Sequence, residues 1–87
     1  MKSITWEEES YSDSKCFEIK TGNISITITN GHIDNPGEWV MHCYDLGIKT
    51  HSLNVKTIRE AQLNSVEIVK TILNNMINDL NSISYKG

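Results

Sequence analysis

Hydrophobic and polar residues alternate along the first half of the chain, which indicates β-strands. In the clearest run, from Ile24 to Thr29, isoleucine alternates with serine and threonine. A period of two places the isoleucines on one face of a strand, and β-branched residues favour that conformation. Turn signals at Thr21-Gly22-Asn23, between Asn30 and Gly37, and at Asp45-Leu46-Gly47 separate the runs. The pattern predicts strands at about residues 3–8, 16–20, 24–29, 38–44 and 48–53.

The second half of the chain predicts one helix, at about residues 58–83. Its start, Thr57-Ile58-Arg59-Glu60, fits a capping box, in which the Thr57 hydroxyl accepts a hydrogen bond from the Glu60 amide and the Glu60 carboxylate reaches back. From Ile58 onward the apolar residues recur at helical spacing and cover about half of the circumference.

A sheet followed by a helix can bury one apolar face only if the helix lies across the sheet. The 87 residues suit one domain. The sequence therefore predicts a single two-layer α+β domain over residues 1–87. In it, an antiparallel sheet of four to five strands packs against one long C-terminal helix.

The predicted helix is longer than the predicted strands. A helix over residues 58–83 would span roughly 39 Å, whereas strands of about seven residues span only ~23 Å. The last turns should overhang the sheet and expose Met76, Ile77, Leu80 and Ile83. Because soluble monomers seldom leave such a patch bare, we expect a homodimer or a partner protein to cover it. The alternative is a helix that breaks near Asn74-Asn75 and folds back.

The net charge of −3 lies in the first 13 residues, where Glu7, Glu8, Glu9 and Asp13 face Lys2 alone. Acidic blocks attract basic partners and repel phosphate backbones. No basic stripe is present, so direct nucleic-acid binding is not expected. We predict a protein target with a basic surface, and the alternative is a solvated turn that only keeps the protein soluble.

The apolar runs and the cysteine content indicate the compartment in which the protein is expected. No apolar run approaches the ~18 residues of a membrane span, and no secretory signal is visible. Cys16 and Cys43 are too few for a disulfide scaffold of this size. These features predict a cytoplasmic protein with reduced thiols.

The sequence lacks the common catalytic motifs. A nucleophile would need Cys43 or Cys16 beside one of the histidines, but Cys43 shares the predicted core face with Trp39 and Met41. A thiol in that position acts as a small hydrophobic group. We therefore expect no catalytic residue and no cofactor.

A metal site would need the histidines to meet, with Cys16 or Asp34 as a further ligand. The turn before residue 48 decides whether His42 and His51 can do so. A type I turn with a left-handed Gly47 places His42 opposite Thr50 and turns His51 to the other face. We favour this register, and no metal is expected.

Two surfaces suit partner binding. The outer sheet face would carry Val40, His42 and Tyr44, together with hydroxyl groups of the neighbouring strand. The loop between Asn30 and Gly37 carries His32 and Asp34, and loops on rigid scaffolds often bind partners. The alternatives are an ordinary solvated face and a plain hairpin connection.

The segment from Glu38 to Val69 resembles HicB-type antitoxins. It has an aromatic strand (Trp39 to Cys43), then Leu46-Gly47-Ile48, then a Thr-x-x-Glu-Ala helix start at Thr57. It departs from that family in lacking a strand after the helix and an appended DNA-binding segment. The layout of the whole chain resembles small bacteriophage accessory proteins, including anti-CRISPRs.

The resemblance to phage proteins implies a non-enzymatic inhibitor that blocks a bacterial defence effector in the host cytoplasm. Glu7 to Glu9 would then face a basic, nucleic-acid-binding surface of the effector. One alternative is a protein that sequesters a signalling nucleotide on the helix N-terminus and the cations Lys20, Lys49, Lys56 and Arg59. A further alternative is an antitoxin-like partner of a small toxin.

Overall fold

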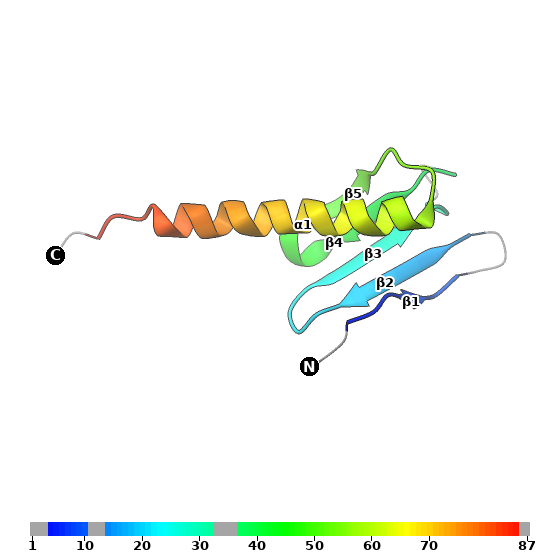
Figure 1. Cartoon of the computed structure of the whole chain (residues 1–87), viewed down its shortest axis with the longest axis horizontal. Coiled ribbons are helices and arrows are strands. Elements are labelled where there is room, and N and C mark those ends of the chain that lie inside the picture. Colours follow the sequence, from blue (N-terminus) through cyan, green and yellow to red (C-terminus); the bar gives the residue numbers. More distant parts are fainter. Residues whose placement is uncertain (1–3, 11–13, 33–36, 86–87) are drawn as a thin grey trace.

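The computed structural model describes residues 4–10, 14–32 and 37–85, and over these residues the protein is a two-layer α+β domain (Figure 1). An antiparallel sheet in the order β1-β2-β3-β4-β5 lies under one long helix, which confirms the fold class that the sequence predicts. The elements are β1 (Glu7–Glu8), β2 (Cys16–Lys20), β3 (Ser25–Thr29), β4 (Val40–Cys43), η1 (Tyr44–Leu46), β5 (Ile48–Ser52) and α1 (Ile58–Asn81).

Four strands are shorter than the alternation predicts: β3 and β5 by one residue each, and the strands predicted at 3–8 and 38–44 by more. The strand expected at about residues 3–8 is reduced to Glu7–Glu8, because only these two residues pair in register with β2 at the sheet edge. The strand expected at 38–44 ends at Cys43, and Tyr44 begins a 3-10 turn instead. Gly47, at φ 79°, donates its amide to the Tyr44 carbonyl and closes this turn. This left-handed glycine was predicted.

Each strand pairs with its neighbour in the chain, and from β1 to β4 the paired residues alternate between the two faces of the sheet. Phe17, Ile28 and Met41 form one cross-strand row, and Glu18, Thr27 and His42 form the adjacent row. Successive side chains of a strand point to opposite faces. The first row therefore faces the helix and the second faces away from it; we call these the inner and outer faces.

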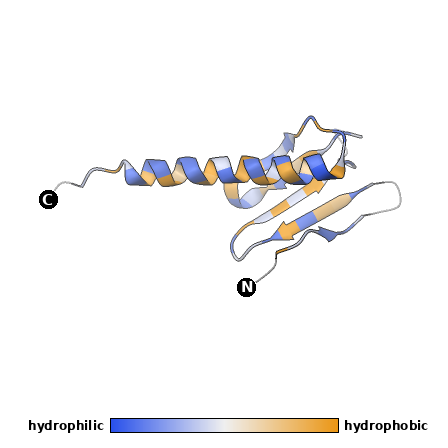
Figure 2. Cartoon of the chain, viewed as in Figure 1, coloured by the Kyte–Doolittle hydropathy of each residue, from blue (hydrophilic) through white to orange (hydrophobic). Residues whose placement is uncertain are grey.

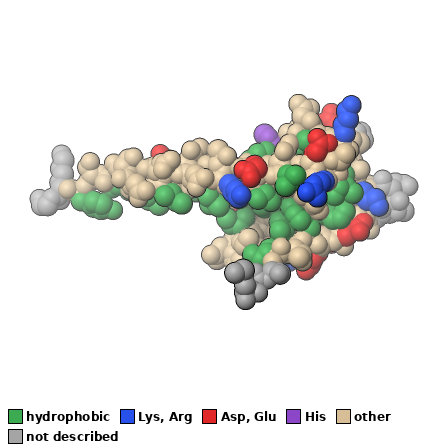
Figure 3. Space-filling model, viewed as in Figure 1, with side chains coloured by type: hydrophobic (Ala, Val, Ile, Leu, Met, Phe, Trp, Pro, Cys, Tyr) green, Lys and Arg blue, Asp and Glu red, His purple; other side chains and the backbone are tan. Residues whose placement is uncertain are grey.

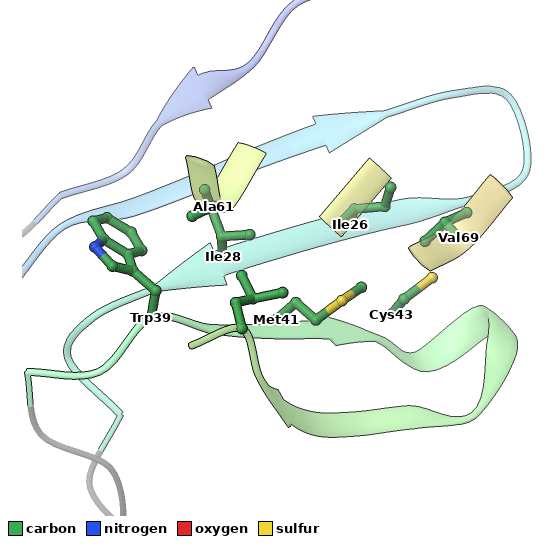
Figure 4. Close-up of a cluster of buried hydrophobic side chains, with 8 residues drawn as sticks. Ile26, Ile28, Trp39, Met41, Cys43, Ala61 and Val69 are labelled. Atoms are coloured by element: carbon green, nitrogen blue, oxygen red, sulfur yellow. The ribbon is translucent and has the colours of Figure 1, made fainter. Parts of the chain in front are cut away.

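The core lies between the inner face and the first half of α1, which packs mainly on β3 and β4. Figure 4 shows Ile26, Ile28, Met41 and Cys43 of the sheet beneath the helix. Ala61, Ser65 and Val69 are the buried helix positions. Two of these residues are small, which allows the helix backbone to approach the sheet closely.

The helix begins as the capping box predicts. The Thr57 Oγ1 accepts a hydrogen bond from the Glu60 amide at 3.2 Å and donates to the Glu60 carboxylate at 2.9 Å. An N-cap of this kind stabilises a helix by about 1 kcal/mol.

The helix ends well beyond the sheet, as its length predicts. It runs through Asn74-Asn75 without a break, which excludes the folded-back alternative. Met76 is 45 % exposed, Ile77 53 %, Leu80 64 % and Ile83 48 %. The apolar stripe nevertheless continues along the whole helix (Figure 2). This overhang raises the radius of gyration to 15.3 Å, against about 12 Å for a compact chain of this length.

A close backbone approach joins the end of β3 to the start of β2. The Lys15 amide donates to the Asn30 Oδ1 at 2.8 Å, and the Thr29 hydroxyl donates to the Lys15 carbonyl at 2.9 Å. A Cβ at Gly31 would lie 2.4 Å from the Ser14 Cβ and 2.2 Å from its Oγ. Only glycine fits at position 31 without a shift of the neighbouring chain.

We predict that Gly31→Ala lowers the free energy of unfolding by about 1–3 kcal/mol, because the new methyl group overpacks against Ser14. Gly22→Ala is the matched control: a Cβ there meets nothing within 4 Å, and the change should stay below about 1 kcal/mol. Urea denaturation measures both. Adding Ser14→Gly should restore part of the loss in Gly31→Ala, and equal stabilities for the two single variants would contradict the close contact.

Candidate protein-interaction surface

The outer face of the sheet is the side that α1 does not cover. One cross-strand row on this face runs from the β1 edge to β4 through Glu7, Glu18, Thr27 and His42. Carboxylates therefore occupy the β1–β2 side of the face and an imidazole occupies the β4 side.

Three rings form a row on the β4 side of the outer face. The centroids of His32 and His42 lie 5.6 Å apart, and those of His42 and Tyr44 lie 5.8 Å apart, with the latter two rings stacked at 10°. The His42 Nδ1 donates to the Lys49 carbonyl, which fixes the orientation of the central ring. Tyr44 is 71 % exposed. The sequence placed His42 and Tyr44 on one face, but no pattern in it placed His32 beside them.

Two carboxylates beside Ser25 are held by defined partners, that of Glu18 in β2 and that of Asp45 in η1. The Ser25 hydroxyl donates to Glu18 at 2.7 Å, and Lys20 lies 3.6 Å from the same carboxylate. The Asp45 carboxylate accepts a hydrogen bond from the Ser25 amide at 2.9 Å. Sequence reasoning missed Glu18 and Asp45, because neither belongs to the acidic run. Only the strand register shows that Glu18 lies beside Glu7.

The acidic run itself divides between the two faces. Glu7 pairs with Glu18 and belongs to the outer face, whereas Glu8 pairs with Phe17 and belongs to the inner side. Glu9 follows on the outer side, and its amide donates to the Cys16 carbonyl at 2.7 Å. Strand alternation therefore separates Glu8 from Glu7 and Glu9, so the three predicted contact residues do not share one face of the sheet.

The structure also corrects one residue of the predicted outer surface. Val40 is 0 % exposed, so it cannot contact a partner. It lies between Thr29 and Ser52 in register, at the base of a loop closed by the hydrogen bond from the Gly37 amide to the Asn30 carbonyl. Asp13 and Asp34, two further predicted residues, lie outside the described residues.

Neither cysteine is set up as a nucleophile. Burial raises the pKa of the Cys16 thiol, and the nearby Glu9 and Glu18 carboxylates raise this pKa further. Burial also raises the pKa of Cys43, Asp45 adds to the rise, and a backbone hydrogen bond from Leu46 opposes it. A raised pKa lowers the thiolate fraction at neutral pH, which is the reverse of what nucleophilic activation requires.

The His42 and His51 side chains, which were candidates for a metal site, do not come together on one face of the sheet. Met41 pairs with His51 while Cys43 pairs with Ile48, so a bulge at residues 49–50 lies opposite His42. His42 and His51 consequently point to opposite faces, as the favoured register predicts. Within residues 4–10, 14–32 and 37–85, no group of three His, Cys, Asp or Glu side chains is arranged to hold a metal ion.

The predicted cations for a nucleotide are also dispersed. Lys20 pairs with Glu18 on the sheet, and the helix N-terminus is occupied by its own Thr57–Glu60 box. Arg59 does line a groove of about 260 Å³ between Trp6 and α1, together with Gln62, Leu63, Val66, Glu67 and Lys70. This groove lies on the inner side of β1, away from the outer face.

Comparison of the chain with protein-family models, with curated proteins and with solved structures finds no match. Across the described part of the chain, no helix combines the length and the apolar character that a membrane crossing requires.

We predict that Cys16 reacts slowly with iodoacetamide in the native protein at pH 8, and that Glu9→Gln speeds this reaction. Removing the carboxylate lowers the pKa of Cys16 and so increases its thiolate fraction. Glu8→Gln, on the opposite face of the same strand, is the matched control and should leave the rate unchanged. Peptide mapping by mass spectrometry separates Cys16 from the buried Cys43. Equal acceleration by both variants would show that net charge alone acts on Cys16.

Proposed function

We propose that this protein is a non-enzymatic inhibitor that binds a protein target through the outer face of its sheet. The observation that carries this proposal is the composition of that face. Paired carboxylates at Glu7 and Glu18 lie on the same uncovered surface as the His32–His42–Tyr44 ring row.

The two halves of this surface serve different steps of binding. Exposed aromatic rings provide contact area at low conformational cost and are enriched among residues that dominate binding energy. Carboxylates steer a basic partner during encounter and fix its orientation. Because Glu7, Glu18 and His42 stand on paired strands and the Tyr44 ring stacks on His42, little ordering is needed when the partner docks.

We infer that the target is a bacterial defence effector with a basic, nucleic-acid-binding surface, met in the cytoplasm of the host cell. The exposed carboxylates of Glu7 and Glu9 on the outer face support a basic target, and the resemblance of the chain layout to phage accessory proteins supports the effector class. In this proposal the protein occupies the surface that the effector needs for its nucleic acid.

The partner is found by affinity purification of the tagged chain from a native bacterial lysate, followed by native mass spectrometry. We expect a stoichiometric protein with a basic surface. A co-purified small toxin would favour the antitoxin alternative, and a bound nucleotide without a protein would favour the sequestration alternative. Either result would overturn the inhibitor proposal.

Once the partner protein is identified, its affinity for variants of this chain can be measured. We predict that Glu7→Lys weakens binding about tenfold at low salt, whereas Glu8→Lys weakens it less than about threefold. Both variants change the net charge equally, but only Glu7 lies on the outer face. Isothermal titration calorimetry at two salt concentrations measures the difference, which should shrink as salt rises. Equal losses would mean that the face of the sheet does not matter.

Tyr44→Ala tests the aromatic half of the surface separately. The side chain is 71 % exposed, so its removal should leave the free energy of unfolding within about 0.5 kcal/mol. We predict that it nevertheless weakens binding by at least about tenfold, as for a central aromatic contact. Unchanged affinity would place the binding site elsewhere.

A further inference from the structure

We propose that two copies of this chain associate through antiparallel pairing of their α1 helices. In this arrangement the overhanging end of each helix enters the groove beside Trp6 of the other copy. The dimer is independent of the inhibitory function proposed above.

Beside the stripe that is buried against the sheet, the helix carries a second, mostly apolar stripe, of which only Val66 and Leu73 also touch the core. It consists of Leu63, Val66, Lys70, Leu73, Ile77 and Leu80, and we call it the seam. These residues follow each other at intervals of three and four, the spacing by which two helices pack along a shared axis. Leu63 is 56 % exposed, although it sits beside the buried stripe that contacts the sheet.

The first half of the seam forms one wall of the groove described above, and Trp6 forms the opposite wall. The groove exists because α1 packs mainly on β3 and β4 and leaves the inner side of the β1 edge partly open. Figure 3 shows apolar side chains spread between the helix and the sheet on this side, and again along the overhang.

The second half of the helix is shaped to enter such a groove. From Asn74 to Asn81 every residue is exposed, so nothing in its own domain obstructs a neighbouring chain. A two-fold axis near residues 71–72 sets Leu63 opposite Leu80 and Val66 opposite Ile77 of the second copy. The exposed second half of each helix then lies in the groove of the other copy. The two contacts are identical, as a two-fold dimer requires.

Buried area favours this arrangement over contact between the two overhangs alone. Met76, Ile77, Leu80 and Ile83 are each about half exposed. They offer on the order of 400 Å² per chain, or about 800 Å² per pair, below the ~1,200 Å² of a stable interface. The antiparallel arrangement adds the exposed parts of Leu63, Val66 and Trp6 from both copies, so it buries more apolar area than contact between the overhangs alone.

The distribution of charge also favours antiparallel pairing of the two helices. The last turn of α1 has no basic residue, and the end of a helix carries a partial negative charge. Antiparallel pairing sets Arg59 of the second copy level with residue 84, beside this end. Lys70, 3.4 Å from Glu67, is the single charged position of the seam. One such residue in an apolar seam fixes the register at some cost in stability.

Light scattering and sedimentation velocity of the full chain test the association. We expect a dimer of twice 9.9 kDa at tens of micromolar, and we expect Leu80→Asp to weaken it by at least about tenfold by placing a charge in the seam. Asn78→Asp adds the same charge on the other side of the helix and should leave the dimer intact. A monomeric native chain at 100 μM would overturn the proposal.

Cross-linking tests the direction of the helices. When chains carrying Leu63→Cys and chains carrying Leu80→Cys are mixed and oxidised, antiparallel pairing should give a disulfide between the two different chains. Leu80→Cys chains alone should give none, and the native chain, with Cys43 buried and Cys16 half-buried, is the background control. A disulfide between two Leu80→Cys chains would show contact between the overhangs and would overturn the antiparallel arrangement.

Discussion

Ala61 and Ser65 are fully buried, and their small side chains bring the helix backbone close to β3 and β4. This contact determines what the remaining surfaces can do. It closes the middle of the inner face and leaves the outer face open to solvent. It also leaves the β1 edge only partly covered, which creates the groove beside Trp6. Because the contact ends near Leu73, the last turns of the helix have no sheet beneath them.

The two proposed interfaces lie on opposite layers of the domain, so they do not compete. The seam and the Trp6 groove belong to the helix side, whereas Glu7, Glu18 and the ring row belong to the outer face. An antiparallel dimer would leave both outer faces accessible. Two linked faces bind a dimeric or repeated target more tightly than one, provided that their spacing matches the target.

The sequence predicted a strand or a helix start correctly where the local residue pattern agrees with the position of that segment in the fold. The Ile24 to Thr29 run alternates and also lies in the middle of the sheet, and Thr57 and Glu60 signal the helix start that the structure contains. The predicted strand lengths were wrong where the length of a strand depends on its pairing with a neighbouring strand. Ile4 to Trp6 alternate well, but at the sheet edge only Glu7 and Glu8 pair with a partner. Alternation likewise placed Val40 on the outer face, but its burial depends on neighbours that no local pattern specifies.

The candidate site was predictable only in part, because its residues meet through register. Glu18 reaches Glu7 across the β1–β2 pairing, and His32 reaches His42 from a loop. The position of these carboxylates also affects the chemistry of Cys16 on the outer face. Burial raises the pKa of Cys16, and the carboxylates of Glu9 and Glu18 raise it further, so the charges that would attract a basic partner also disfavour the thiolate on the same face. That combination suits recognition of a basic surface and opposes thiolate chemistry.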